Sequence, residues 1–106
     1  VLATRSANTA AVQVAEVRLR CHGADVDLAG FQATNPGGQN PSSEGPEKAL
    51  AAKGKWLDTS FRARGRSALV LAAPEDFAVT ELSLRTAGDN PGRDPAALRV
   101  EGLVDG

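Results

Sequence analysis

Short segments in which apolar and polar residues alternate run along this chain, and turn sequences separate them. We find such segments at 12–21, 26–28, 55–58, 67–72, 77–86 and 97–103. Successive residues of a strand point to opposite faces of a sheet, so a period of two predicts half-buried strands. No long helical pattern occurs, and only 47–53 would suit one or two helical turns. We therefore expect an all-β fold, an antiparallel sandwich or barrel.

The first of these segments changes phase along its length. Its apolar residues at 12–14 share one face, and those at 17–21 share a face only after a shift of one residue. A β-bulge near 15–16 would produce such a shift. Residues 1–11 show no periodicity and are expected to form an extended lead-in, so we expect the sandwich domain to span 12–106.

A long polar loop between 31 and 46 carries the first candidate binding residues. It contains Asn-Pro-Gly-Gly, Asn-Pro and Glu-Gly-Pro turns, in which glycine permits positive φ and proline fixes φ. Loops of this length inside a compact domain are often functional. Amides and a carboxylate can hydrogen-bond sugar hydroxyls or a protein backbone, which makes candidates of Asn35, Gln39, Asn40 and Glu44. The alternative is that the loop only shapes a crossover connection.

Three alternating arginines form the second candidate group. On a strand, Arg62, Arg64 and Arg66 would line one face, where guanidinium groups could hold a carboxylate, sulfate or phosphate. The alternative is a solvated charged face. The whole chain carries 12 basic and 13 acidic residues, a net charge of -1. It therefore lacks the overall positive charge of a nucleic-acid-binding protein, and no nucleic-acid partner is expected.

Catalytic and metal chemistry find little support in the residue types present. The single cysteine, Cys21, precedes the single histidine, His22. Neighbouring strand residues point to opposite faces and so cannot form a nucleophile–base pair. Asp25 and Asp27 alternate, but two carboxylates are a weak calcium signal because Ca²⁺ takes six to eight oxygen ligands. We expect no enzyme activity, no metal and no cofactor. No apolar run reaches the about 20 residues that span a bilayer, so the chain is not expected to cross one.

Several segments resemble one known family through their order and spacing. They are Gln-Val-Ala-Glu-Val-Arg-Leu at 13–19, Ala-Thr-Asn-Pro-Gly-Gly-Gln-Asn-Pro at 33–41, Glu-Gly-Pro-Glu-Lys-Ala-Leu at 44–50, Lys-Trp-Leu-Asp at 55–58, Leu-Val-Leu at 69–71, Asp-Asn-Pro-Gly-Arg-Asp-Pro at 89–95 and Leu-Arg-Val-Glu-Gly at 98–102. In this order the chain resembles a discoidin domain, also called the coagulation factor 5/8 C-type domain. These domains are galactose-binding-like jelly rolls.

The resemblance implies an antiparallel β-sandwich jelly roll in which Trp56 is a core residue, with ligand stacking as its alternative role. We also expect Leu82 and Leu84 in the core. Many family members hold a structural calcium with an Asp-Gly pair and a threonine before the tryptophan. The stretch 51–55 has no carboxylate, so no calcium is expected. Family domains continue past 105–106, so the jelly roll is expected to lack its last strands and to leave a sheet edge for a partner.

Three functions stay open on these residues. The first is a non-catalytic protein-interaction module, a small accessory or scaffolding subunit docked on a larger assembly, such as a membrane-embedded organellar complex of the photosystem kind. The second is a carbohydrate-binding module that uses the loop 35–44. The third is binding of anionic lipid, with Phe61 as an apolar spike beside Arg62 and Arg64. The chain starts at Val1 and contains no methionine. A processed N-terminus is therefore expected, together with an organelle lumen or an extracytoplasmic compartment.

Overall fold

A computed structural model describes residues 1–51, 54–75 and 78–102 of this chain. Within these ranges the fold is β-rich, with two single-turn helices and one 3₁₀ turn. The strands are β1 (Ala3–Thr4), β2 (Val12–Val14), β3 (Glu16–Cys21), β4 (Ala24–Asp25), β5 (Gln32–Thr34), β6 (Trp56–Asp58), β7 (Val70–Ala72), β8 (Glu81–Arg85) and β9 (Pro95–Ala97). The helical elements are α1 (Lys48–Ala51), α2 (Phe61–Arg64) and η1 (Pro91–Arg93).

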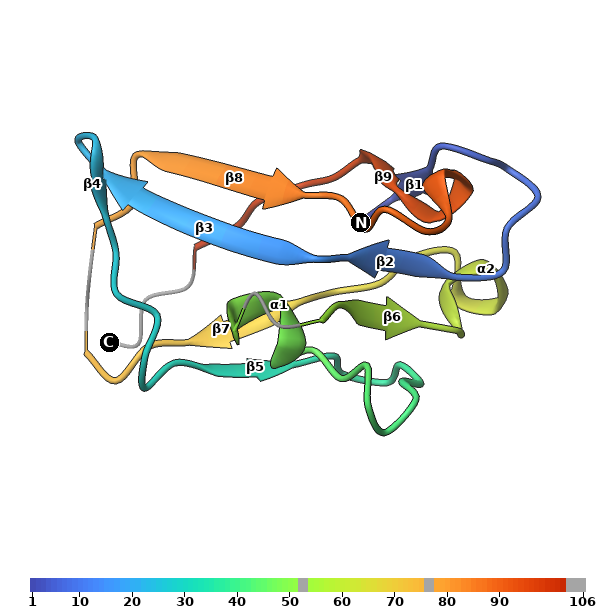
Figure 1. Cartoon of the computed structure of the whole chain (residues 1–106), viewed down its shortest axis with the longest axis horizontal. Coiled ribbons are helices and arrows are strands. Elements are labelled where there is room, and N and C mark those ends of the chain that lie inside the picture. The colour runs from blue at the N-terminus through green and yellow to red at the C-terminus, as the bar shows by residue number, and fades with distance from the viewer. Residues whose placement is uncertain (52–53, 76–77, 103–106) are drawn as a thin grey trace.

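Every strand pair in the structure is antiparallel. A three-stranded sheet has the order β4-β3-β8, and the pairs β2-β6, β5-β7 and β1-β9 complete the set. Figure 1 shows β3 and β8 along one side of the molecule and β5 with β7 along the other. The prediction of a β-rich antiparallel fold is confirmed at this level.

The phase shift at 15–16 has a structural cause, a change of strand partner. β2 pairs with β6, and its last residue lies opposite Trp56. After Ala15 the chain continues as β3 and pairs with β8, beginning with Glu16 opposite Arg85. All three residues of β2 are buried, whereas β3 buries the alternate residues Val17 and Leu19, and neither ladder contains a bulge.

The core is small and lies against β3. Its buried members are Val14, Val17, Leu19, Ala49 and Trp56. Helix α1 packs against β3 and contributes Ala49. Partly buried apolar side chains pack around this cluster, and these are Val26, Leu28, Phe31, Leu69, Leu71 and Leu84.

One of the expected core residues is exposed. Leu82 lies opposite Leu19 in the β3-β8 ladder, so both side chains point to the same face of the sheet. Leu19 is only 8% exposed, whereas Leu82 is 36% exposed. β8 is the edge strand of the sheet as described, and the core partly covers Leu84 on this strand but leaves Leu82 exposed. The alternation predicted the correct face for Leu82, but its assignment to the core is wrong.

Two expected strands are not found where they were predicted. Residues 26–28 were predicted as a strand but form none, and the nearest strand is β4 at Ala24–Asp25. The segment 97–103 was expected to be a strand, yet the last strand, β9, ends at Ala97. β9 pairs with β1, which lies inside the lead-in of residues 1–11. The described residues beyond it, 98–102, join no ladder, and Leu98 and Val100 are exposed. The position of this last strand is set by its pairing with β1, which local alternation does not encode.

The arginine segment 62–66 is also not a strand. Residues 61–64 form helix α2. The Asp58 carboxylate accepts a hydrogen bond of 2.9 Å from the backbone N–H of Ser60 at the start of this helix. Gly65 adopts a positive φ of 74° at its end, and its N–H bonds to Phe61 O at 2.8 Å. The arginines therefore do not line one face of a strand. No helix in the described ranges is long and apolar enough to cross a membrane.

Candidate functional site

The polar loop packs onto the core through its asparagine side chains. The Asn40 Oδ1 atom accepts hydrogen bonds from Trp56 Nε1 at 2.9 Å and from Asn35 Nδ2 at 3.0 Å. The turn that follows Asn35 closes with a bond of 3.0 Å from Gly38 N to Asn35 O. Asn35 and Asn40 are thus brought together as predicted candidates, but their amide groups bind each other and the buried indole. In this part of the loop, the two asparagines attach the loop to the buried side chain of Trp56.

A buried aspartate joins the same loop to α2. Asp58 accepts hydrogen bonds from Ser67 Oγ at 2.5 Å, Ser60 Oγ at 2.7 Å and Gln39 N at 3.2 Å. Burial opposes ionisation of Asp58, but the hydrogen bonds outweigh it and lower its pKa from 3.8 to about 2. Asp58 therefore stays charged and fixes three segments of the chain at once.

The three candidate arginines point to different partners. Arg64 donates to Pro36 O at 3.0 Å and lies 3.9 Å from the Asp58 carboxylate. Arg62 donates to Asn8 O at 3.4 Å, and Arg66 is exposed beyond the end of α2. They do not form one anion site. Phe61, the expected lipid-contacting spike beside them, is buried. The lipid-binding hypothesis thereby loses its apolar contact.

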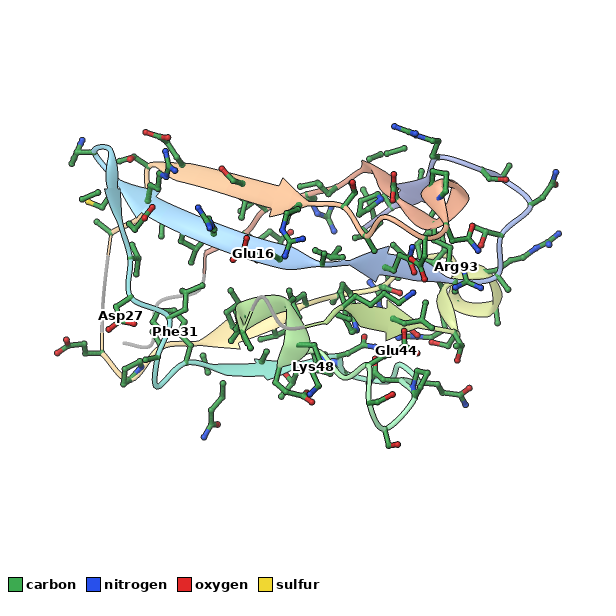
Figure 2. All side chains as sticks on the ribbon, viewed as in Figure 1. Glu16, Asp27, Phe31, Glu44, Lys48 and Arg93 are labelled. Carbon is green, nitrogen blue, oxygen red and sulfur yellow. The ribbon has the colours of Figure 1, made fainter. Side chains whose placement is uncertain are left out.

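A hollow around Lys55 is the best-formed candidate site that includes a predicted residue. Its volume is about 530 Å³, and it is lined by Ala15, Ser43, Glu44, Gly54, Lys55, Arg85, Ala87, Gly88 and Asp89. We call this the Lys55 hollow. Glu44 is the one predicted residue that lines it, and Glu44 O accepts a backbone bond of 3.0 Å from Leu57 N. Figure 2 shows Glu44 toward the end of the molecule that holds α2, far from Asp27 and Phe31 at the opposite end.

The Lys55 ammonium group is surrounded by oxygen atoms from separate segments. Lys55 Nζ lies 2.7 Å from Gln13 Oε1, 2.6 Å from Asp89 Oδ2 and 3.5 Å from Glu44 Oε2. The hydrogen bond from Lys55 is the main cause that lowers the pKa of Asp89. Gln13 is fully buried, and its Nε2 donates to Asp89 Oδ1 and to Asn90 O, both at 3.1 Å. The ammonium group therefore ties the loop, β2 and the 88–90 turn together.

The sequence gives no direct sign that Lys55, Gln13 and Asp89 are neighbours. The signal that was available is the amide of Gln13 between two valines of a fully buried strand. A buried amide needs hydrogen-bond partners, and that requirement points to polar residues nearby. Which residues supply them depends on the β2-β6 ladder and on the 88–90 turn, which are non-local.

The Lys55 hollow is lined by negatively and positively charged side chains and by small residues. The charged residues are Glu44, Asp89, Lys55 and Arg85, and the small ones are Ala15, Gly54, Ala87 and Gly88. In the part of the chain that the structure covers, no three His, Cys, Asp or Glu side chains gather where they could hold a metal ion. The Lys55 hollow can bind polar groups through Glu44, Asp89 and Arg85, with space left by Gly54 and Gly88. No family model, curated protein or solved structure matches this chain.

Proposed function

We propose that this chain is a non-catalytic interaction module with the β-sandwich jelly roll of a discoidin domain. In this proposal it serves as a small accessory or scaffolding subunit that docks on a protein partner in a larger assembly. The order of the family-like segments along the sequence and the exclusively antiparallel pairing of the described strands support the proposal.

The observation that carries it is the exposed core face of β8. Leu19 on β3 is buried, but its cross-strand neighbour Leu82 on β8 is exposed to solvent. The described residues therefore leave part of the apolar face of the sheet uncovered at β8. Val79, just before β8, is exposed as well, and so is Val70 on β7. An edge strand with an apolar face is a surface to which another chain can add a strand. A partner bound along β8 would bury these side chains.

The test is site-specific photo-crosslinking of the full chain in its natural cells. One variant carries the crosslinking residue at position 82, and a matched control carries it at position 42, an exposed site in the polar loop. We expect a discrete crosslinked protein from position 82 and none from position 42. Equal products from both positions, or none from position 82, would remove the proposal.

Carbohydrate binding is the second candidate, and the Lys55 hollow favours it. A carboxylate can accept hydrogen bonds from sugar hydroxyls and a neighbouring guanidinium group can donate to them, and residues of both kinds line this open hollow. In this form the binding residues are Glu44, Asp89 and Arg85. The amides of Asn35 and Asn40, which the sequence suggested, are bonded to each other.

Titration of the chain with a panel of neutral monosaccharides, followed by amide NMR shifts, tests this candidate. A Cβ at Gly88 would meet no atom within 4 Å, so Gly88→Leu is expected to narrow the hollow without disturbing the fold. Gly102→Leu has the same open surroundings and lies outside the lining of the hollow, which makes it the control. Shifts that Gly88→Leu leaves unchanged, or an absence of shifts, would count against sugar binding here.

A further inference from the structure

The strand β8 has an open edge on the side away from β3. It pairs with β3 along its whole length, from Glu81 opposite Arg20 to Arg85 opposite Glu16. No second strand within the ranges 1–51, 54–75 and 78–102 pairs with β8. The backbone N–H and C=O groups on its outer side are therefore available to a strand from another chain.

The sequence of β8 is complementary to itself when two copies run in opposite directions. Its five residues are Glu-Leu-Ser-Leu-Arg, with Ser83 at the centre. Directly opposite residues of antiparallel strands lie on the same face of a sheet. If two copies of β8 pair around Ser83, Glu81 lies opposite Arg85 of the second copy, and Leu82 lies opposite Leu84 of the second copy. Each pair forms twice, because the arrangement has two-fold symmetry.

The two charged ends of β8 are incompletely paired within one chain. Glu81 is exposed and forms no ion pair with any residue that the structure describes, since Arg20 opposite it contacts Asp25 at 3.0 Å instead. Arg85 Nε lies 3.4 Å from Glu16 Oε1, a carboxylate oxygen that a second arginine contacts at 3.2 Å. The Arg85 side chain is 56% exposed, and a guanidinium group has five N–H donors. A second copy would therefore bring an unpaired carboxylate to a guanidinium group with donors left.

The order of the charges along β8 identifies the occupant, because their sum does not. The outer face of this sheet carries three arginines and three carboxylates, which are Arg18, Arg20, Arg85, Glu16, Glu81 and Asp25. Such a face favours neither a cationic nor an anionic partner, and two copies of it do not repel each other. β8 is acidic at its first residue and basic at its last. An antiparallel copy reverses that order and so places opposite charges together at both ends.

The apolar face of β8 gains cover from the same pairing. Leu82 is exposed to solvent, whereas Leu84 is partly buried against the core. With Ser83 at the centre, Leu84 of each copy lies beside Leu82 of the other, with their Cβ atoms roughly 4.5–5.5 Å apart. A shift of two residues in either direction would separate Glu81 from Arg85 of the second copy. The charges and the leucines therefore favour one register.

We propose that β8 pairs with β8 of a second copy of this chain, antiparallel and centred on Ser83. The two three-stranded sheets then join into one continuous sheet. This inference rests on the proposed interaction function and names a second copy of this chain as the protein partner at β8. A five-residue strand is short, and stable interfaces bury about 1,600 Å² in total, so we expect a reversible dimer rather than an obligate one.

The test of the register is a disulfide at the two-fold axis. Cys21, the single cysteine of the sequence, is first replaced by serine, and Ser83→Cys is introduced into this full chain. Directly opposite Cα atoms of antiparallel strands lie roughly 4.5–5.5 Å apart, within the range that a disulfide spans. We expect Ser83→Cys to form a covalent dimer on mild oxidation, and Ser42→Cys, on an exposed residue of the polar loop, to stay monomeric. Equal dimer from both variants, or none from Ser83→Cys, would overturn the proposal.

The test of the charge pairing is an exchange of charges, followed by sedimentation equilibrium. We expect Glu81→Arg and Arg85→Glu each to weaken self-association at least tenfold, because like charges then face each other at both ends of β8. An equimolar mixture of the two variants should associate within about threefold of the parent chain, because opposite charges again face each other. Glu75→Arg and Arg66→Glu make the same changes at exposed sites outside β8 and should leave association unchanged. Equal losses in these controls would overturn the proposal.

The crosslinking experiment at position 82 separates this inference from the function on which it rests. A product of twice the mass of the chain supports self-pairing, together with the disulfide at position 83. A product that contains a different protein, with no disulfide dimer from Ser83→Cys, would leave the docking function in place and overturn the self-pairing. If position 82 yields no product and Ser83→Cys no dimer, both proposals are wrong.

Discussion

The region around Trp56 and the region around β8 belong to one small β-rich fold but differ in how their side chains are paired and covered. Around Trp56, side-chain hydrogen bonds join segments far apart in sequence, through Asn40, Asp58 and Lys55. Around β8, the charged pairs are mostly exposed and an apolar side chain, Leu82, is left uncovered. Buried hydrogen-bonded polar groups contribute more to stability than exposed ion pairs do. The first region therefore pairs its buried polar groups within the molecule, and the second leaves an apolar side chain and its charged pairs open to solvent.

The largest effect that separates the two regions is expected from their large apolar side chains. Trp56→Ala should lower the free energy of unfolding by about 3–5 kcal/mol, because the indole is fully buried. Leu82→Ala, the matched change at β8, should lower it by less than about 1 kcal/mol. Denaturant unfolding of both variants measures the difference. Similar losses would show that the two regions contribute equally to the core.

A second difference should appear in the pH dependence of stability. The pKa of Asp58 is about 2 in the folded state, below the ordinary value of 3.8. The unfolded chain therefore takes up the proton first as the pH falls. The stabilisation by the charged carboxylate, roughly 2 kcal/mol, is complete above pH 4 and is lost between about pH 4 and 2.

Urea unfolding measured from pH 6 to pH 2 tests this dependence. Asp58→Asn should be less stable than the parent chain above pH 4 and should show a flatter profile below it. Glu75→Gln, on an exposed carboxylate, is the control and should follow the parent profile. A parent profile that stays flat between pH 4 and 2 would contradict the assigned role of Asp58.

A smaller effect is expected from the amide that holds the loop to the indole. Asn40→Ala removes the acceptor of Trp56 Nε1 and of Asn35 Nδ2, and should cost about 1–2 kcal/mol of unfolding free energy. Gln39→Ala keeps the backbone bonds of residue 39 and should change it by less than about 0.5 kcal/mol. Thermal unfolding of the two variants compares them. A greater loss from Gln39→Ala would place the anchor of the loop elsewhere.

Substitution of Leu82 by a polar residue is expected to have a small effect on stability and a large effect on binding. Leu82→Ser should lower the unfolding free energy by less than about 1 kcal/mol, as expected for Leu82→Ala, because the side chain is already accessible to solvent. The same change should weaken binding of the partner that docks along β8 at least tenfold. Chemical unfolding and a binding titration with the partner identified by crosslinking give both quantities. A stability loss as large as that of Trp56→Ala would mean that Leu82 belongs to the core.

Local alternation predicted five of the nine described strands because the pattern itself is local. It located β2, β3, β6, β7 and β8, and it detected the phase shift at Ala15. It misassigned the arginines at 62–66, because alternating charges do not distinguish a strand from a helix whose ends are fixed by Asp58 and Gly65. Alternation also could not predict burial. It indicates which face of the sheet Leu82 lies on, but not whether another element covers that face.

The candidate site was even less accessible from sequence. Glu44 was identified, but its neighbours Lys55 and Asp89 come from segments 11 and 45 residues further along the chain. The asparagines chosen for binding turned out to hold the loop, because the indole of Trp56 needs an acceptor. A polar residue in the sequence indicates that its side chain needs hydrogen-bond partners. Whether these partners belong to the protein or to a ligand depends on which segments the fold brings together.

The single residue between β2 and β3 places one arginine between two surfaces of the molecule. Ala15 donates its N–H to Arg85 O at 2.9 Å, and both residues line the Lys55 hollow. Arg85 also lines the shallow hollow on the outer face of the β3-β8 ladder. A ligand in either hollow that moves Arg85 would therefore change the wall of the other. By linkage, the factor by which one such ligand alters the affinity for the other would be the same in both directions.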